Sequence, residues 1–118
     1  MGFVVYGIGS CDTVRKARKW LDARGQEHVF VDFRKNPPEA ERVAGWVDAL
    51  GSKAMRNTSG GAYWALPDAK KGWSDDEWAA QFAAELMLIK RPIIERNGQA
   101  VLVGFRGSDD ALAEALGL

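Results

Sequence analysis

The chain has 118 residues, of which 47% are hydrophobic and 27% are charged, and its 16 basic side chains balance its 16 acidic ones. This length and apolar share predict one globular domain that buries roughly two thirds of the surface its unfolded chain would expose. They argue against disorder and against a multi-domain architecture. A net charge of zero also argues against nucleic-acid binding, which normally requires a basic excess.

The single cysteine, Cys11, limits the chemistry further. One cysteine cannot close an internal disulfide, and it falls short of the several that a structural zinc site would want. We therefore expect neither a disulfide nor a metal. No basic leader precedes the first apolar run, and no run approaches the ~20 residues that span a bilayer. We expect a soluble protein of the reducing cytoplasm with no membrane contact.

The first third of the chain predicts a strand, a turn, a helix and a second strand. Residues 3–6 form a β-branched and aromatic run that ends at residues 7–10, Gly-Ile-Gly-Ser. A helix begins directly after Cys11 and ends at Gly25. Residues 28–33 predict the next strand, joined to the first by a right-handed parallel crossover. The helix carries its apolar residues at Val14, Ala17 and Leu21.

Residues 37–87 predict mainly helices. Pro38 suits the first turn of a helix that ends at Gly51. Residues 52–72 are irregular, and we expect a loop with at most a short helical turn. Ser74 and Glu77 form a capping box at the start of another helix, which runs to about Met87. The apolar residues at helical spacing are Val43, Trp46, Val47 and Leu50 in the first helix and Trp78, Phe82, Leu86 and Ile89 in the second.

The C-terminal residues predict a hairpin and a short helix. Asn97-Gly98 is the preferred two-residue loop of a type I′ hairpin, and it joins strands at 93–96 and 99–103. Ser108 caps the last helix. The order β-α-β, helical stretch, β-β-α is that of a thioredoxin-like α/β fold with a mixed four-stranded sheet. We expect one domain over 1–118, with its core in 1–36 and 88–118 and a helical insertion at 37–87.

Cys11 is the candidate nucleophile. It lies between a strand and a helix, where free backbone N–H groups and the helix dipole favour an anion, and Arg15 follows one turn later. These features favour the thiolate, and the same N–H groups could hold an oxyanion. The alternative is an inert buried cysteine, but the preceding glycine and serine leave the sulfur little apolar cover. His28 is remote in sequence, so a Cys-His dyad is not expected.

Two arginines are candidates for binding an anion beside Cys11. Arg91 precedes Pro92, and a thioredoxin-like fold places a cis-proline next to the active-site turn. That placement would bring the Arg91 guanidinium near the sulfur as a fork for carboxylates and oxyanions. Arg106 lies within a glycine-flanked segment after the last strand, which can direct a side chain toward a neighbouring site. For each, the alternative is a solvated surface charge.

Four segments form an ordered set: Tyr6-Gly-Ile-Gly-Ser-Cys11-Asp-Thr-Val-Arg15-Lys-Ala, Asn57-Thr58, Leu88-Ile-Lys-Arg91-Pro92-Ile and Val103-Gly-Phe-Arg106. In this set the chain resembles the arsenate reductase (ArsC) family of glutaredoxin-linked enzymes. The resemblance is strongest to the YffB-like branch of glutathione-dependent thiol reductases, and it covers nearly the whole chain.

The resemblance implies a thioredoxin-like core with a helical insert and a nucleophilic Cys11. It also implies that the anion or glutathione site contains Thr13, Arg15, Asn57, Arg91, Pro92 and Arg106. It implies no bound cofactor or metal, glutathione as a co-substrate, a glutaredoxin as a partner, and a small oxyanion or a disulfide as the substrate.

Two positions depart from the arsenate reductases. Gly7 stands where those enzymes carry a histidine four residues before the cysteine. Asn57 stands where they carry a third anion-binding arginine, with Arg56 one place away, so either residue could complete the anion site. The related Spx-type regulators use a Cys-x-x-Cys switch, and Val14 occupies the second cysteine position here.

We therefore predict a glutathione-dependent thiol-disulfide oxidoreductase in which Cys11 attacks and arginines hold the negative groups of the substrate. Because the chain has no second cysteine, an external thiol must release the covalent intermediate. One alternative is a glutaredoxin-linked arsenate reductase that uses the same cysteine. An alternative of another class is an Spx-like, non-enzymatic regulator that binds a protein partner such as RNA polymerase.

Overall fold

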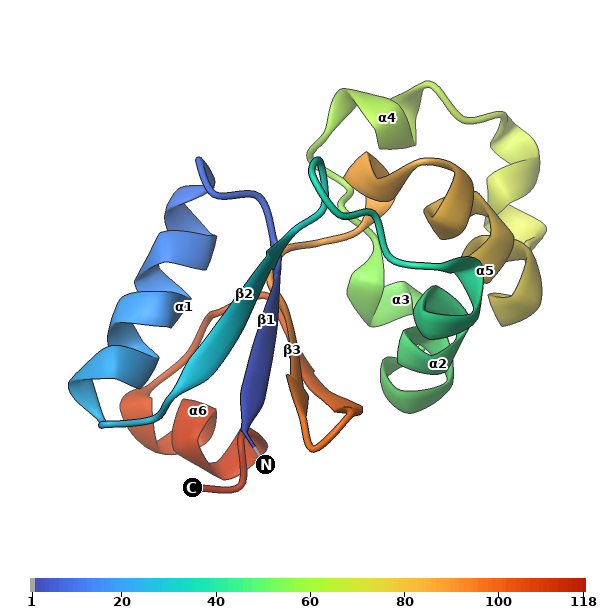
Figure 1. Cartoon of the computed structure of the whole chain (residues 1–118). Coiled ribbons are helices and arrows are strands. Elements are labelled where there is room, and N and C mark those ends of the chain that lie inside the picture. The colour runs from blue at the N-terminus through green and yellow to red at the C-terminus, as the bar shows by residue number, and fades with distance from the viewer. Residues whose placement is uncertain (1) are drawn as a thin grey trace.

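The computed structural model describes residues 2–118, which contain a mixed four-stranded sheet with helices on both faces (Figure 1). The strands are β1 (Phe3–Gly7), β2 (His28–Asp32), β3 (Ile93–Arg96) and β4 (Gln99–Val103). Their order across the sheet is β2-β1-β3-β4. β1 and β2 are parallel, whereas β3 is antiparallel to both β1 and β4. The predicted α/β class and mixed sheet are confirmed.

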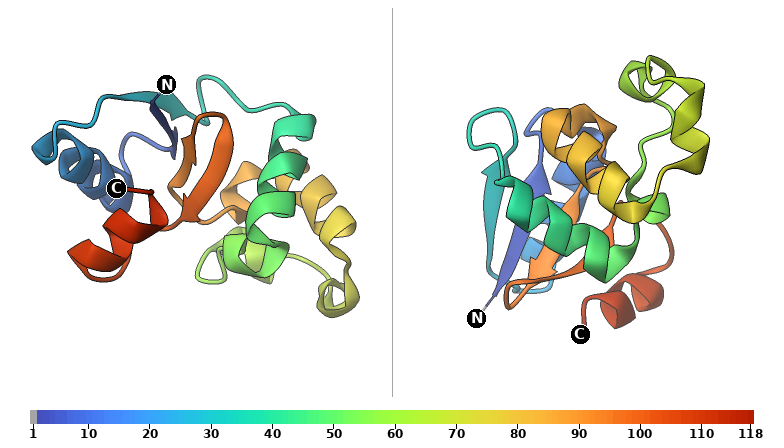
Figure 2. Two further views of the ribbon diagram at one scale, coloured as in Figure 1. Left: turned by 90° about the horizontal axis from the view of Figure 1, so that it is seen from below. Right: turned by 90° about the vertical axis from the view of Figure 1, so that its right-hand side faces the viewer.

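Helices cover the two faces of the sheet unequally. α1 (Asp12–Ala23) and α6 (Asp109–Ala115) lie on one face. The other face carries α2 (Ala40–Leu50), α3 (Ser52–Met55), α4 (Gly61–Trp64) and α5 (Asp75–Ala84), with the 3₁₀ helices η1 (Asp68–Gly72) and η2 (Leu86–Leu88). Seen from below, the strands lie between these two layers (Figure 2). Within residues 2–118, no helix has the length and apolar character needed to cross a membrane.

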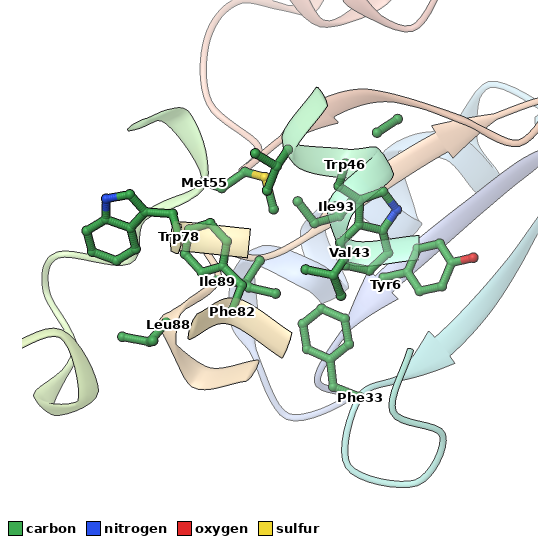
Figure 3. Close-up of a cluster of buried hydrophobic side chains, with 12 residues drawn as sticks. Tyr6, Phe33, Val43, Trp46, Met55, Trp78, Phe82, Leu88, Ile89 and Ile93 are labelled. Carbon is green, nitrogen blue, oxygen red and sulfur yellow. The ribbon is translucent and has the colours of Figure 1, made fainter. Parts of the chain in front are cut away.

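Alternating side chains of the central strands form a core on each side of the sheet. On the side of α1 and α6, Val5 packs in a buried cluster with Leu21 and Leu116. On the other side, Tyr6 packs with Trp46 and other side chains of the insert (Figure 3). Because both faces are covered, β1 has the nearly continuous apolar sequence typical of a central buried strand.

The structure contains the predicted hairpin turn and the predicted N-caps of α5 and α6. Asn97 and Gly98 have φ angles of 54° and 80°, as a type I′ hairpin requires. The Ser74 hydroxyl accepts from the Glu77 N–H while the Glu77 carboxylate accepts from the Ser74 N–H, which completes the capping box. Ser108 caps α6 by accepting from the N–H of Ala111 at 3.1 Å.

The helical insert differs from the sequence prediction in three places. α2 begins at Ala40 rather than at Pro38, because Glu39 has extended backbone angles and is the N-cap. α5 ends at Ala84, since extended Glu85 separates it from η2 and its carboxylate accepts from the Met87 N–H. Residues 52–72, predicted as a loop with at most a short helical turn, contain the three short helices α3, α4 and η1. Each is too short for a helical period to show in the sequence.

Glu95 is a buried carboxylate beneath α2 and is only 2% exposed. Three side chains donate hydrogen bonds to it: Arg42 at 2.7 Å, Trp46 Nε1 at 2.7 Å and the Tyr6 hydroxyl at 3.3 Å. Arg42 and Trp46 belong to α2, while Tyr6 and Glu95 belong to β1 and β3. The carboxylate therefore ties the helical insert to the two central strands.

This cluster predicts a loss of stability in alkali. Burial, followed by the nearby charge of Glu95, raises the pKa of Tyr6 above its ordinary value of 10.0. Above pH 10 the unfolded chain loses this proton before the folded chain does, so the free energy of unfolding falls as pH rises further. We expect Tyr6→Phe to flatten that fall in urea titrations between pH 8 and about 11. An equal alkaline slope in both proteins would show that Tyr6 is not responsible.

Candidate active site

Cys11 is the N-cap residue of α1, with extended backbone angles of φ −77° and ψ 124°. The turn before it is closed by a hydrogen bond from the Cys11 N–H to the Ile8 carbonyl at 3.0 Å. Cys11 is a free thiol and is half-buried, so the structure does not give it the fully enclosed position of an inert core cysteine. Its sulfur therefore lies at the positive end of a 12-residue helix.

The turn is anchored to the neighbouring strand by Asp32, at the end of β2. The Asp32 carboxylate accepts from the Gly9 N–H at 3.1 Å and from the Arg34 N–H at 2.8 Å. These backbone hydrogen bonds, with that of Arg34 the stronger influence, hold the pKa of the Asp32 carboxyl below its ordinary value. Asp32 therefore remains ionised at neutral pH and fixes the loop that presents Cys11.

Gly7 is required by the packing of α1 against β1. A Cβ atom at Gly7 would lie 2.6 Å from Cγ2 of Val14, which is fully buried. The space next to position 7 is thus filled by Val14, the residue at the position of the second cysteine in a Cys-x-x-Cys switch. Any side chain at position 7, including a histidine, requires Val14 to move.

We expect Gly7→Ala to destabilise the protein by about 1–3 kcal/mol, the usual cost of overpacking a core. In the Val14→Ala background, where the clashing methyl group is absent, the same change should cost much less. Urea unfolding of the four proteins of this cycle measures the difference. Equal costs in both backgrounds would contradict the close packing of Gly7 against Val14.

Cys11 lines a pocket of about 850 Å³ that brings distant segments together. The first turns of α1 contribute Cys11 and Thr13, and the segment after α3 contributes Asn57. The segment before β3 contributes Arg91, and the segment after β4 contributes Arg106. Five of the seven residues expected at the site therefore line one cavity.

The other two expected residues do not line this pocket. Arg15 is paired with Asp12 on the exposed side of α1. Pro92 is buried behind the pocket, where its carbonyl accepts from the Gly104 N–H at 2.8 Å. The Arg91–Pro92 peptide bond is cis, as predicted. Pro92 therefore contributes through the backbone, whereas Arg15 makes no contact with the cavity.

The structure distinguishes Asn57 from Arg56. Asn57 lines the pocket, and its N–H donates to the Leu88 carbonyl at 2.8 Å. Arg56 donates to the Ser52 hydroxyl at 3.0 Å, and its guanidinium lies 4.4 Å from the centre of a Trp78 ring. Neighbouring residues in extended backbone point in opposite directions. Asn57, not Arg56, is thus directed to the Cys11 pocket.

Two lysines that sequence reasoning missed also line the pocket, Lys16 and Lys90. Lys16 follows Thr13 by three residues and precedes Trp20 by four, so the three form one stripe along α1; this helical spacing was the available signal. The stem of Lys90 packs over Gly104, where a Cβ would lie 3.3 Å from the Lys90 Cδ. Its ammonium group is thereby brought to the cavity wall.

The pocket carries unbalanced positive charge. Lys16, Lys90, Arg91 and Arg106 all line it. Within the part of the chain that the structure describes, none of these four forms an ion pair. The one carboxylate of the lining, Asp109, is engaged by Trp20 and Arg24. In a chain with zero net charge, this concentration of cations favours an anionic ligand.

The one histidine of the chain, His28, lies outside this pocket. His28 Nε2 accepts from Arg18 Nε at 3.3 Å. Among residues 2–118, no group of three or more His, Cys, Asp or Glu side chains is arranged to hold a metal ion. The reactive groups of the pocket are one thiol and the cations around it.

Comparison with known proteins finds relatives over nearly the whole chain. The model of the ArsC family matches residues 6–112. The uncharacterized protein YusI of Bacillus subtilis is 36% identical over 110 residues, which cover 90% of this chain and 92% of YusI. The solved structure of the YffB (PA3664) protein superimposes with a TM-score of 0.83 at 34% identity, covering 97% of this chain and 98% of that one.

A second solved structure, described as a possible arsenate reductase from Streptococcus mutans, superimposes with a TM-score of 0.80 at 35% identity. The match covers 93% of this chain and 96% of the other. Likeness in sequence and in fold therefore extends over the core, the helical insert and the segments that line the pocket.

Proposed function

Because this chain belongs to the ArsC family, we propose that it is a glutathione-dependent thiol-disulfide oxidoreductase with Cys11 as its single nucleophile. The observation that supports this most directly is the position of the thiol. It is half-exposed at the positive end of α1 and faces a cavity lined by four cations without ion-pair partners among residues 2–118.

The proposed reaction has two thiol-exchange steps. The Cys11 thiolate attacks the glutathione sulfur of a mixed disulfide, so that a Cys11–glutathione disulfide forms and the other thiolate leaves and takes up a proton. The thiolate of a second glutathione then attacks the sulfur of the bound glutathione. Glutathione disulfide forms, Cys11 is released as a thiolate, and the two electrons that reduce the substrate come from glutathione.

The positive side chains of the pocket match the negative charges of glutathione. Glutathione carries two carboxylates, and arginine binds a carboxylate through two parallel N–H groups. Arg91 and Arg106 are the proposed partners of these carboxylates, with Lys16 and Lys90 adding positive charge. Cys11 is the only cysteine, so the enzyme depends on an external thiol for turnover.

Arsenate reduction is the competing activity, because a neighbouring structure is described as a possible arsenate reductase. An arsenate ion could bind at the start of α1 beside Arg91 and Arg106. However, Gly7 and Asn57 depart from the arsenate reductase pattern, and the structure shows that Val14 fills the space beside Gly7. We therefore place disulfide reduction first.

The deciding experiment compares two substrates with the wild-type protein. We expect rapid reduction of the mixed disulfide between glutathione and 2-mercaptoethanol when glutathione is supplied, and little arsenite formation from arsenate with glutathione and a glutaredoxin. Dominant arsenite formation would replace the proposal with arsenate reduction. A protein that reduces neither substrate would contradict both activities and favour the non-enzymatic regulator.

A further inference from the structure

The loop of residues 104–107 carries Arg106 from β4 to α6, and the first residue of α6, Asp109, is attached to the end of α1 by two side chains, Trp20 and Arg24. Trp20 Nε1 donates to Asp109 Oδ1 at 3.1 Å, and Arg24 pairs with Asp109 Oδ2 at 3.3 Å. The Arg24 guanidinium also lies 3.8 Å from the centre of the Trp20 ring. We call these three residues, Trp20, Arg24 and Asp109, the clasp.

A second contact joins the same loop to the clasp. The Phe105 ring meets the Trp20 ring edge-on, with centroids 5.7 Å apart and an interplanar angle of 73°. Phe105 directly precedes Arg106, and Asp109 follows it by three residues. The loop is therefore attached to α1 on both sides of Arg106, and Trp20, Phe105 and Asp109 all line the Cys11 pocket.

The ion pair of the clasp contributes little to the free energy of folding. The side chain of Asp109 is 73% exposed and that of Arg24 is 35% exposed, and exposed ion pairs contribute little to folding. The Trp20 N–H, followed by Arg24, lowers the pKa of the Asp109 carboxyl below its ordinary value. The carboxylate is therefore ionised at neutral pH and available to both partners.

The loop itself does not fix the direction of Arg106. Gly104 and Gly107 have φ angles of 73° and 119°, in the region that glycine adopts freely. Arg106 is exposed, and within residues 2–118 its side chain has no hydrogen-bond or ion-pair partner. Its place beside the pocket therefore depends on how the loop is attached.

We propose that Trp20, Arg24 and Asp109 are positioning residues of the Cys11 site. Together they hold loop 104–107 against α1, so that the Arg106 guanidinium stays at the pocket and strengthens the binding of anionic substrates. The clasp acts through Arg106 and does not touch the reacting sulfur. Its kinetic consequence rests on the proposed function, whereas its effect on the potential at Cys11 does not.

Because Asp109 is negatively charged, the two possible roles of this residue predict opposite changes in the electrostatic potential at Cys11 when it is neutralised. If Asp109 acted only as a negative charge in the pocket, Asp109→Asn would make the surroundings of Cys11 more positive. If Asp109 holds the loop, the same change releases Arg106 and makes the surroundings less positive. Trp20→Phe changes no charge, so any effect of that variant on the potential comes from the movement of charged groups, and the Arg106→Gln background shows whether Arg106 is the group that moves.

The experiment alkylates Cys11 with iodoacetate, which is negative, and with iodoacetamide, which is neutral. In each reaction the thiolate displaces iodide and forms a thioether, so the ratio of the two rates reports the potential at the sulfur. We expect a roughly threefold fall in the iodoacetate to iodoacetamide ratio in both Asp109→Asn and Trp20→Phe at low ionic strength. Arg106→Gln should give a similar fall.

The matched control is Asp110→Asn, which removes the same charge from the same first turn of α6 but lies outside the clasp and the pocket lining. It should leave the ratio unchanged or raise it slightly. In the Arg106→Gln background, Trp20→Phe should cause no further fall, because the clasp acts through that arginine. Circular dichroism and thermal melting confirm that each variant is folded.

Enzyme kinetics supply the second readout. We expect both clasp variants to raise the KM for the glutathione mixed disulfide by about fivefold with little change in kcat, as for a residue that affects binding alone. A higher iodoacetate to iodoacetamide ratio in Asp109→Asn, together with an unchanged ratio in Trp20→Phe, would contradict the positioning role of the clasp. If the wild type lacks reductase activity but the ratios behave as expected, the proposed function fails and the clasp stands.

Discussion

Replacing Cys11 with serine should abolish the glutathione-dependent reduction of disulfides that we propose for this protein. The variant hydroxyl remains protonated at neutral pH and cannot form a disulfide, so both exchange steps are lost. We expect the rate in the presence of Cys11→Ser to equal the rate without protein, a loss of several orders of magnitude. The coupled assay that follows glutathione disulfide formation with glutathione reductase and NADPH measures this directly.

The matched control for this loss is Ser10→Ala, which changes the exposed neighbour in the same turn. This variant should retain activity, because the Ser10 side chain does not line the Cys11 pocket. Thermal unfolding should show that Cys11→Ser is as stable as the wild type to within a few degrees, since the half-buried thiol and a hydroxyl differ little in size. Substantial turnover by Cys11→Ser would exclude the mechanism.

The elements that sequence predicts well are those with long or chemically specific patterns. The stripe Val14, Ala17 and Leu21 defines α1 because it spans two helical turns and is fully buried against the sheet. The Asn97-Gly98 dipeptide specifies its hairpin because both residues tolerate positive φ. By contrast, α3 and α4 contain four residues each, about one helical turn, and tertiary contacts decide their conformation.

The convergence of the site is predictable because its segments meet at the same end of the strands of the sheet. Cys11 follows β1, Arg91 precedes the antiparallel strand β3, and Arg106 follows β4. Each segment therefore lies at the end of the sheet where β1 terminates. Once the strand order is known, proximity of the thiol and the two arginines follows, although the chain separates them by as many as 95 residues.

The direction of individual long side chains was harder to predict. Arg15 was expected at the anion site, but Asp12, three residues before it, lies on the same side of α1 and pairs with it. Lys16 occupies the pocket instead. Successive residues of a helix point in directions about 100° apart. Arg15 and Lys16 are both basic and adjacent, so the resemblance to a family could not tell which of them faces the pocket.

The buried carboxylate of Glu95 could not be predicted at all, because its partners come from two other elements, α2 and β1, that are distant from it in the sequence. In the sequence Glu95 is one of two charged residues that end a four-residue hairpin strand. Only the fold shows that Arg42 and Trp46 of α2 and Tyr6 of β1 meet there. A buried charge is retained only when it has such partners, so Glu95 is the position where we expect the largest effect on stability.

Glu95→Ala should destabilise the protein by about 3–5 kcal/mol, because it leaves buried neutral donors without an acceptor and opens a cavity beneath α2. It leaves the buried Trp46 N–H without its acceptor at 2.7 Å and takes from Arg42 its carboxylate partner. Glu95→Gln keeps an acceptor of the same shape and should cost about 1–3 kcal/mol. The free energy of unfolding in urea at pH 7 measures both.

The control for charge is Glu41→Gln, an exposed carboxylate in the first turn of α2. It should change stability by less than about 1 kcal/mol. The structural role of Glu95 also predicts an order, with Glu95→Ala least stable, Glu95→Gln intermediate and Glu41→Gln near the wild type. A cost for Glu95→Ala no larger than that of Glu41→Gln would mean that the insert docks on the sheet through its apolar contacts alone.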